Sequence, residues 1–200
     1  MAEKIVIDVF KEKNASDFTA ALADPDGRAQ GGSAAAYTAA MACALSQRVA
    51  QRCAKSVPGE RIDYIARNCG ILRDYMVHLI DEEVKSRRPY LRAVKQGGER
   101  EVEATIQTAA CIDAEIINMM KPLLEFILEL CDQCSEEEKV YLAQAAELAV
   151  CACKVSRNTV LAFGDKSTDE IYRYVTKREN EVFLSERTAL YDSVLSKLGV

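Results

Sequence analysis

Apolar side chains recur between residues 62 and 79 at alternating steps of three and four. The positions are Ile62, Ile65, Cys69, Leu72, Met76 and Leu79. This spacing places all six on one face of an α-helix, as in a helix that packs along its length in a bundle. The next step of the series is Glu83. A carboxylate in an apolar stripe must leave the core, find a partner or carry a raised pKa. The sequence therefore predicts a long bundle helix and leaves open whether Glu83 is buried or solvated.

The rest of the chain also favours helices. Its 200 residues include four prolines, nine glycines, no tryptophan and 49% hydrophobic residues, which suits helices better than short strands. Caps, turn residues and apolar spacing predict five further helical segments. They are a short one capped near Asn14 and holding Phe18, one from Ser33 to about residue 55, one over about 99–134, one from Ser135 to Gly164, and one from the Ser167–Glu170 capping box to about Leu198.

Several signals refine these segments. Residues 24–27 form a turn by composition, and Gly97-Gly98 marks another. Pro89 interrupts a basic stretch over 85–92, and Pro122 is expected to bend or split its helix. Residues 141–155 are apolar on nearly all faces, so their helix is expected to be central.

Together these segments predict an all-α, multihelical up-and-down bundle. No repeat, low-complexity tract or long linker divides the chain, so residues 1–200 are expected to form one domain, with residues 1–13 as an N-terminal arm that is extended to Phe10. The helices carry more apolar surface than one small bundle can readily bury, which predicts a homodimer.

Charge and hydropathy exclude several function classes. The net charge of −5 offers no general attraction to nucleic acid or membrane. The first ten residues lack the basic start and long apolar core of a signal peptide, and no run is long enough to span a membrane. We expect a cytoplasmic protein without a nucleic-acid or membrane partner.

The eight cysteines fit a reducing compartment. The pairs Cys131/Cys134 and Cys151/Cys153 have metal-site spacing. If their helices are antiparallel, however, Cys151 lies roughly 20 Å from the turn at ~1.5 Å per residue. We expect thiols and no metal site.

The segment Gly31-Gly32-Ser33 precedes an alanine-rich run. Glycines allow close approach of the backbone, and Ser33 is a good helix cap. The unpaired N–H groups of such a helix start attract anions and polar rings. Taken alone, however, Gly-Gly-Ser is more often a plain turn before a core helix. Further along the same run, Arg48, Arg52 and Lys55 share one face, which is either solvated surface or a carboxylate-binding site.

Two other polar positions have candidate roles. Ser135 and Glu136 open a helix whose first turn is acidic. Asn158 continues the line of Leu148, Cys151 and Val155, so its amide is expected to point inward. The only histidine, His78, lies beside the apolar stripe and is expected at the surface.

The order of these elements resembles the cyclodeaminase/cyclohydrolase family, from about Phe18 to the C-terminus. The most specific part is a short helix, then Ala29-Gln30-Gly31-Gly32-Ser33, then the alanine-rich helix; the family's turn is Pro-Gly-Gly-Gly-Ser. Glu83 falls where the family has an aspartate, and Ser135-Glu136 where it has Ser-Asp. Val155 and Asn158 remain from an Asn-Val-x-x-Asn pattern, and Lys55 from a Gly-Lys-Lys stretch.

This resemblance implies a dimeric helical bundle that acts on C–N bonds of methenyl- or formimino-tetrahydrofolate, as cyclohydrolase or cyclodeaminase. The folate is the substrate, and no metal or redox cofactor is needed. Glu83 would be the proton-transfer group, with Glu136 or Asn158 positioning it or the one-carbon bridge. Gly31, Gly32 and Ser33 would lie against the ligand, and Arg48, Arg52 or Lys55 near its glutamate carboxylates.

The alternative is a folate-binding or helical assembly protein of the same fold that has lost the chemistry. The shortened glycine turn, the reduced lysine stretch and glutamate at two aspartate positions favour it. A misplacement of ~1 Å can cost ~100-fold in rate.

Overall fold

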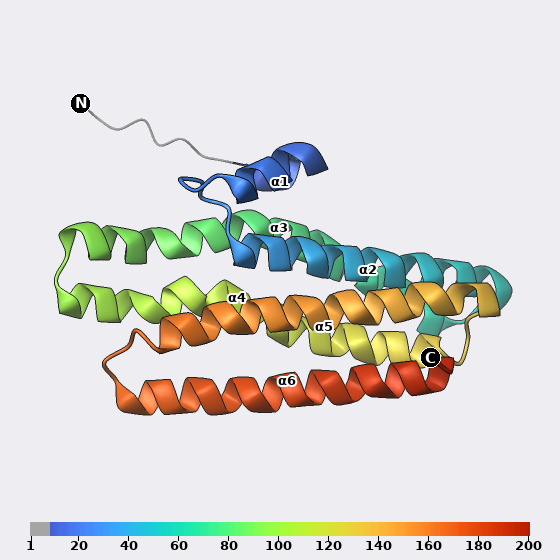
Figure 1. Ribbon diagram of the computed structural model, residues 1–200. Coiled ribbons are helices and arrows are strands. Elements are labelled where there is room, and N and C mark those ends of the chain that lie inside the picture. The colour runs from blue at the N-terminus through green and yellow to red at the C-terminus, as the bar shows by residue number, and fades with distance from the viewer. Residues whose placement is uncertain (1–8) are drawn as a thin grey trace.

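The computed structural model describes residues 9–200, which form six α-helices after one turn of 3-10 helix, with no strand among them (Figure 1). The elements are η1 (Phe10–Glu12), α1 (Ala15–Ala23), α2 (Gly31–Ser56), α3 (Glu60–Gln96), α4 (Glu99–Leu130), α5 (Glu136–Gly164) and α6 (Glu170–Leu198). The predicted all-α fold is confirmed.

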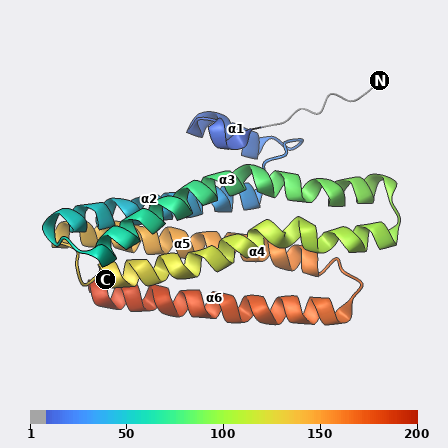
Figure 2. The same ribbon diagram turned by 180° about the vertical axis from the view of Figure 1, so that it is seen from behind.

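The five long helices run up and down beside one another, and α1 lies against one side of the bundle (Figures 1 and 2). Helix α5 contacts α2, α4 and α6, and α2 contacts α3, α4 and α5. The apolar segment 141–155 therefore lies in a helix with neighbours on three sides, as expected. Within residues 9–200, no helix combines the length and the apolar composition that a membrane span requires.

The apolar stripe of α3 faces the core as predicted. Ile62, Ile65, Cys69, Met76 and Leu79 are buried, and Leu72 is half-buried. The series continues inward at Glu83, whose side chain is fully buried. The helix does not emerge into solvent there, so this carboxylate belongs to the interior.

Two predicted caps are confirmed and two are wrong. Asn14 accepts a hydrogen bond from Asp17 N, and Ser135 forms a capping box with Glu138. Helix α2, however, begins at Gly31, so Ser33 lies inside its first turn. Helix α6 is capped by Asp169, which accepts from two backbone N–H groups, while the hydroxyl of Ser167 donates to Glu103.

Neither proline splits its helix, and the bend expected at Pro122 stays a prediction. Pro89 lies inside α3 and Pro122 inside α4, and both helices continue through them. A proline removes one backbone hydrogen bond, and packing of the surrounding turns offsets that loss. Leu123 and Leu124, directly after Pro122, are fully buried.

The expected extended arm is only partly testable, because residues 1–8 lie outside the described part of the chain. Residues 10–12 form a 3-10 turn and are not extended. Phe10 is buried, and its N–H donates to Asp81 Oδ1 at 2.7 Å. The end of the arm is therefore attached to α3, two residues before Glu83.

Candidate functional site

Two carboxylates are buried beside the start of α2. Glu83 comes from α3 and Asp113 from α4, and both are fully buried. Ser33 Oγ donates to Glu83 Oε2 at 2.7 Å, and Arg87, one turn along α3, forms an ion pair with Glu83. We call Gly32, Ser33, Glu83, Arg87 and Asp113 the acid cluster. Ser33 and Arg87 are thus the two side chains that hold Glu83 in place.

Gly32 provides the space in which the two acids meet. A Cβ at this position would lie 2.7 Å from Glu83 Cγ and 2.8 Å from both carboxylate oxygens of Asp113. Glu83 from α3 and Asp113 from α4 therefore both lie against the Cα of Gly32, where a Cβ would be. A side chain on residue 32 would displace at least one of them.

Asp113 lacks the partners that Glu83 has. No well-aligned hydrogen bond reaches either of its carboxylate oxygens from residues 9–200, although the Ser156 and Thr159 hydroxyls lie close enough to lower its pKa. Burial raises the pKa of Asp113 from 3.8 to about 6, against the opposing effects of Arg87, Ser156 and Thr159. Asp113 is thus a carboxyl group that binds a proton near neutral pH.

The raised pKa of Asp113 predicts a pH-dependent stability difference. The folded protein binds this proton more tightly than the unfolded chain, so stability falls as pH rises from about 4 to about 6. The loss is about 3 kcal/mol at 1.36 kcal/mol per pKa unit. The Asp113→Asn variant lacks this pH-dependent loss. When thermal unfolding is measured at a series of pH values, the Tm of the variant minus the Tm of the native protein is expected to increase from about pH 4 to about pH 6. A Tm difference that is constant with pH would contradict the assignment.

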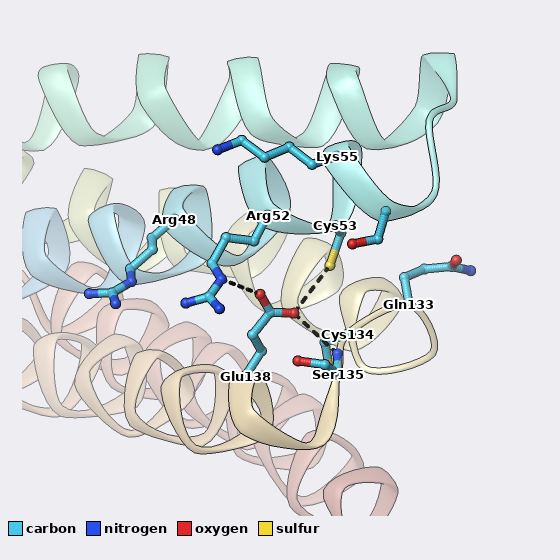
Figure 3. Close-up of a pocket in the computed structure, with 9 residues that line it drawn as sticks. Arg48, Arg52, Cys53, Lys55, Gln133, Cys134, Ser135 and Glu138 are labelled. Carbon is cyan, nitrogen blue, oxygen red and sulfur yellow. Dashed lines mark hydrogen bonds and ion pairs between the residues drawn. The ribbon is translucent and has the colours of Figure 1, made fainter.

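A second polar region lies where α2 ends and α5 begins (Figure 3). It is a cleft of about 740 Å³. Arg52 Nε lies 2.7 Å from Glu138 Oε1, and the Arg48 guanidinium lies 4.6 Å from the ring centre of Tyr141. We call this region the basic cleft; its lining residues are Arg48, Arg52, Cys53, Lys55, Ser56, Gln133, Cys134, Ser135 and Glu138. The three predicted basic residues do line one cleft.

The predicted site residues fall into two groups at opposite ends of α2. Gly31, Gly32 and Ser33 lie with Glu83 at its start, and the basic cleft is at its end. Ser33 and Arg52 are nineteen residues apart on this helix, about 29 Å at ~1.5 Å per residue. One chain therefore holds the glycine turn and the basic residues apart, and the expectation that both contact one folate stays a prediction.

Glu136 and Asn158 are both exposed, whereas Glu83 is buried. Glu136 is exposed at the start of α5, beside the basic cleft, and pairs with Lys139 at 2.7 Å. Asn158 is exposed and does not point inward as predicted. The line through Cys151 and Asn158 faces outward, and Ser156 occupies the inward position. A part in catalysis for Glu136 or Asn158 stays a prediction.

Sequence reasoning missed Asp113, although the signal was present. Ile106, Ala109, Asp113, Ile116 and Met120 follow the same alternation of three and four as the stripe of α3. All five are buried. An acid within an apolar series marks a buried carboxylate here, as it does at Glu83.

The cysteines are free thiols, several of them buried. Burial, with a smaller effect from Glu138, raises the pKa of Cys53 to about 11, and burial raises that of Cys131 to about 11. Within the described part of the chain, no group of three or more His, Cys, Asp or Glu side chains is placed to hold a metal ion. The absence of a metal cofactor stays a prediction.

The protein is an up-and-down bundle with two acids buried beside a glycine-rich helix start. Helical bundles commonly build their functional sites in this way, from side chains on facing helices. The model of the formiminotransferase-cyclodeaminase family matches residues 14–181, and the chain belongs to this family. The resemblance inferred from the sequence is thereby confirmed.

The fold is also found in a solved structure. The crystal structure of formiminotetrahydrofolate cyclodeaminase from Thermotoga maritima matches with a TM-score of 0.87 and 22% sequence identity. The match covers 94% of this chain and 97% of that chain. A comparison with curated protein sequences finds no match.

Proposed function

We propose that the protein is a folate-dependent one-carbon enzyme that acts on C–N bonds of methenyl- or formimino-tetrahydrofolate. Family membership supports folate chemistry. The observation that carries the enzymatic proposal is Glu83, a buried carboxylate that Ser33 and Arg87 hold at the first turn of α2.

Either reaction needs a proton removed from the attacking group and a proton supplied to the nitrogen that leaves. In hydrolysis, water attacks the methenyl carbon and loses a proton, and a ring nitrogen leaves. In cyclisation, the folate amine attacks the formimino carbon and loses a proton, and ammonia leaves. Glu83 accepts the proton of the attacking group, and its charge stabilises the cationic bridge.

Ligand entry requires a local opening beside α2. Gly31 is exposed, whereas Gly32 and Ser33 are buried. The acid cluster is therefore buried, but the residue next to it along α2 is at the surface. The connection between α1 and α2 has no regular secondary structure. We place the entry of the one-carbon bridge at this connection.

A homodimer would bring the two regions together. Tyr37 and Met41 are exposed and Leu45 is half-buried on the face of α2 that also carries Arg52. A second copy that packs antiparallel on this face, with the two-fold axis near Met41, would place the basic cleft of one protomer beside the acid cluster of the other. We propose this arrangement, in which the basic cleft binds the glutamate tail of the folate.

A titration of folate binding tests the role of the basic cleft. Arg52→Ala is expected to weaken binding of a tetrahydrofolate polyglutamate about 10-fold, because it removes a charge-assisted contact worth roughly 1.4 kcal/mol. Calorimetry measures this. Arg178→Ala is the matched control, since this exposed arginine of α6 lies outside the cleft. A native protein that gives neither heat nor a thermal shift would refute the folate proposal.

The alternative function is a binding or assembly protein that keeps the bundle without turnover. The observation that favours it is the ion pair between Glu83 and Arg87, both buried, because such a pair also serves as a structural element. Turnover assays separate the two.

A further inference from the structure

Six buried side-chain atoms have no well-aligned hydrogen bond among residues 9–200. Two of them are Glu83 Oε1, which forms an ion pair with Arg87, and Arg157 Nε. The other four belong to Asp113 and its neighbours. They are both carboxylate oxygens of Asp113, Arg87 Nε and Ser156 Oγ. Buried polar groups in folded proteins are nearly always paired, and each exception calls for a cause. These atoms come from α3, α4 and α5 and mark a place suited to polar atoms of a ligand.

The unpartnered acid adjoins the proposed proton acceptor. Asp113 oxygens and Glu83 Cγ lie within 2.8 Å of the point that a Gly32 Cβ would occupy. Glu83 is held by Ser33 and Arg87, whereas no well-aligned hydrogen bond reaches the Asp113 oxygens from residues 9–200. Two carboxyl groups in one site with different surroundings are suited to opposite roles, one as base and one as acid.

We propose, building on the proposed function, that Asp113 is a second catalytic residue and supplies the proton to the nitrogen that leaves. In hydrolysis, the water oxygen bonds to the methenyl carbon as its proton passes to Glu83. The C–N bond then breaks with its electron pair on nitrogen, which takes the proton of Asp113, and the hydroxyl on the carbon becomes the formyl C=O and releases its proton to solvent. In cyclisation, the folate amine gives its proton to Glu83, and the departing amino group takes that of Asp113 and leaves as ammonia. Proton transfer from Glu83 to Asp113 restores the site, directly or through solvent.

The charges around Asp113 suit a proton donor. Arg87 and Glu83 face it from α3, the Ser156 and Thr159 hydroxyls from α5, and Gly32 from α2. Burial is the largest effect, and it raises the pKa of Asp113 to about 6. The acid therefore keeps a usable protonated fraction near neutral pH.

The test is the pH profile of kcat/KM in the native protein and in Asp113→Asn, with the uncatalysed rate subtracted. Native kcat/KM is expected to fall with pH above about 6, the pKa of Asp113. Asp113→Asn is expected to be at least 10-fold slower at pH 6 and to lack this fall. Asp113→Ala serves as a second neutral variant. Asp81→Asn is the matched control, because Asp81 is a buried acid of α3 that binds the N–H of Phe10.

Each outcome decides the matter. The proposal is supported if both Asp113 variants are slower than the native protein and their kcat/KM does not decrease above about pH 6. If an Asp113 variant keeps the native rate, or keeps the native decrease of kcat/KM above about pH 6, the role of Asp113 is refuted and the proposed function stands. The same holds if the Asp113 variants lose no more rate than Asp81→Asn. Variants that fail to fold overturn it too, since removal of this buried charge should stabilise the chain. A native protein that turns over neither substrate refutes the proposed function and this inference with it.

Discussion

Glu83→Gln is expected to lower kcat for methenyl- or formimino-tetrahydrofolate by at least about 100-fold, because a positioned proton-transfer group contributes ~10²–10⁴ in rate. Glutamine keeps the size of the side chain and can accept from Ser33, but it neither takes a proton nor carries charge. The loss of methenyltetrahydrofolate absorbance measures hydrolysis, and ammonia release from formiminotetrahydrofolate measures cyclisation. The substrate that the native protein uses also settles which reaction it catalyses.

Glu82→Gln is the matched control for this prediction. The same chemical change falls one residue earlier on α3, where the side chain is 31% exposed and pairs with Lys85 at 2.6 Å. Its kcat is expected to stay within about twofold of native, as for a surface ion pair. Equal activity of the native and Glu83→Gln proteins would show that Glu83 is not the group that accepts the proton. Folate binding without any native turnover would favour the binding-protein alternative.

Gly32→Ala is expected to be the most damaging single-methyl change in α2. Its Cβ would lie within 2.8 Å of Glu83 and Asp113, closer than van der Waals contact allows. Overpacking of this kind costs about 1–3 kcal/mol, so thermal unfolding should show a Tm several degrees lower. Turnover should fall by ~100-fold, since a displacement of ~1 Å is enough.

Gly31→Ala provides the control for the glycine prediction. A Cβ there would meet only Val155 Cγ1, at 3.9 Å, which is ordinary contact. Alanine also favours helix over glycine by about 1 kcal/mol, so Tm should be unchanged or higher. An equal loss of stability in both variants would mean that helix-start geometry, and not the acid cluster, requires the glycines.

The apolar spacing of α3 predicted its long buried face, and it singled out Glu83. It could not place Glu83 in the core, because burial depends on Ser33, fifty residues earlier, and on the arrangement of α2 against α3. The same spacing in α4 contained Asp113 and would have predicted a second buried acid.

Other features were hidden from the sequence for definite reasons. Helix α5 is apolar on several faces, so its pattern does not say which row faces inward, and Asn158 was assigned to the wrong side. Ser167 and Asp169 both have the chemistry of a helix cap. The choice between them depends on Glu103, which binds the Ser167 hydroxyl from α4.

The internal ion pair of Glu83 has an evolutionary consequence. Loss of Glu83 alone would leave the buried guanidinium of Arg87 without its partner, which is strongly destabilising. Selection for a stable fold would thus retain Glu83 in a lineage that had already lost turnover, and its persistence among homologues would be a poor marker of activity. Asp113 behaves in the opposite way, since its buried charge destabilises the fold at neutral pH. An aspartate kept at this position across diverging sequences would indicate selection for chemistry and not for stability.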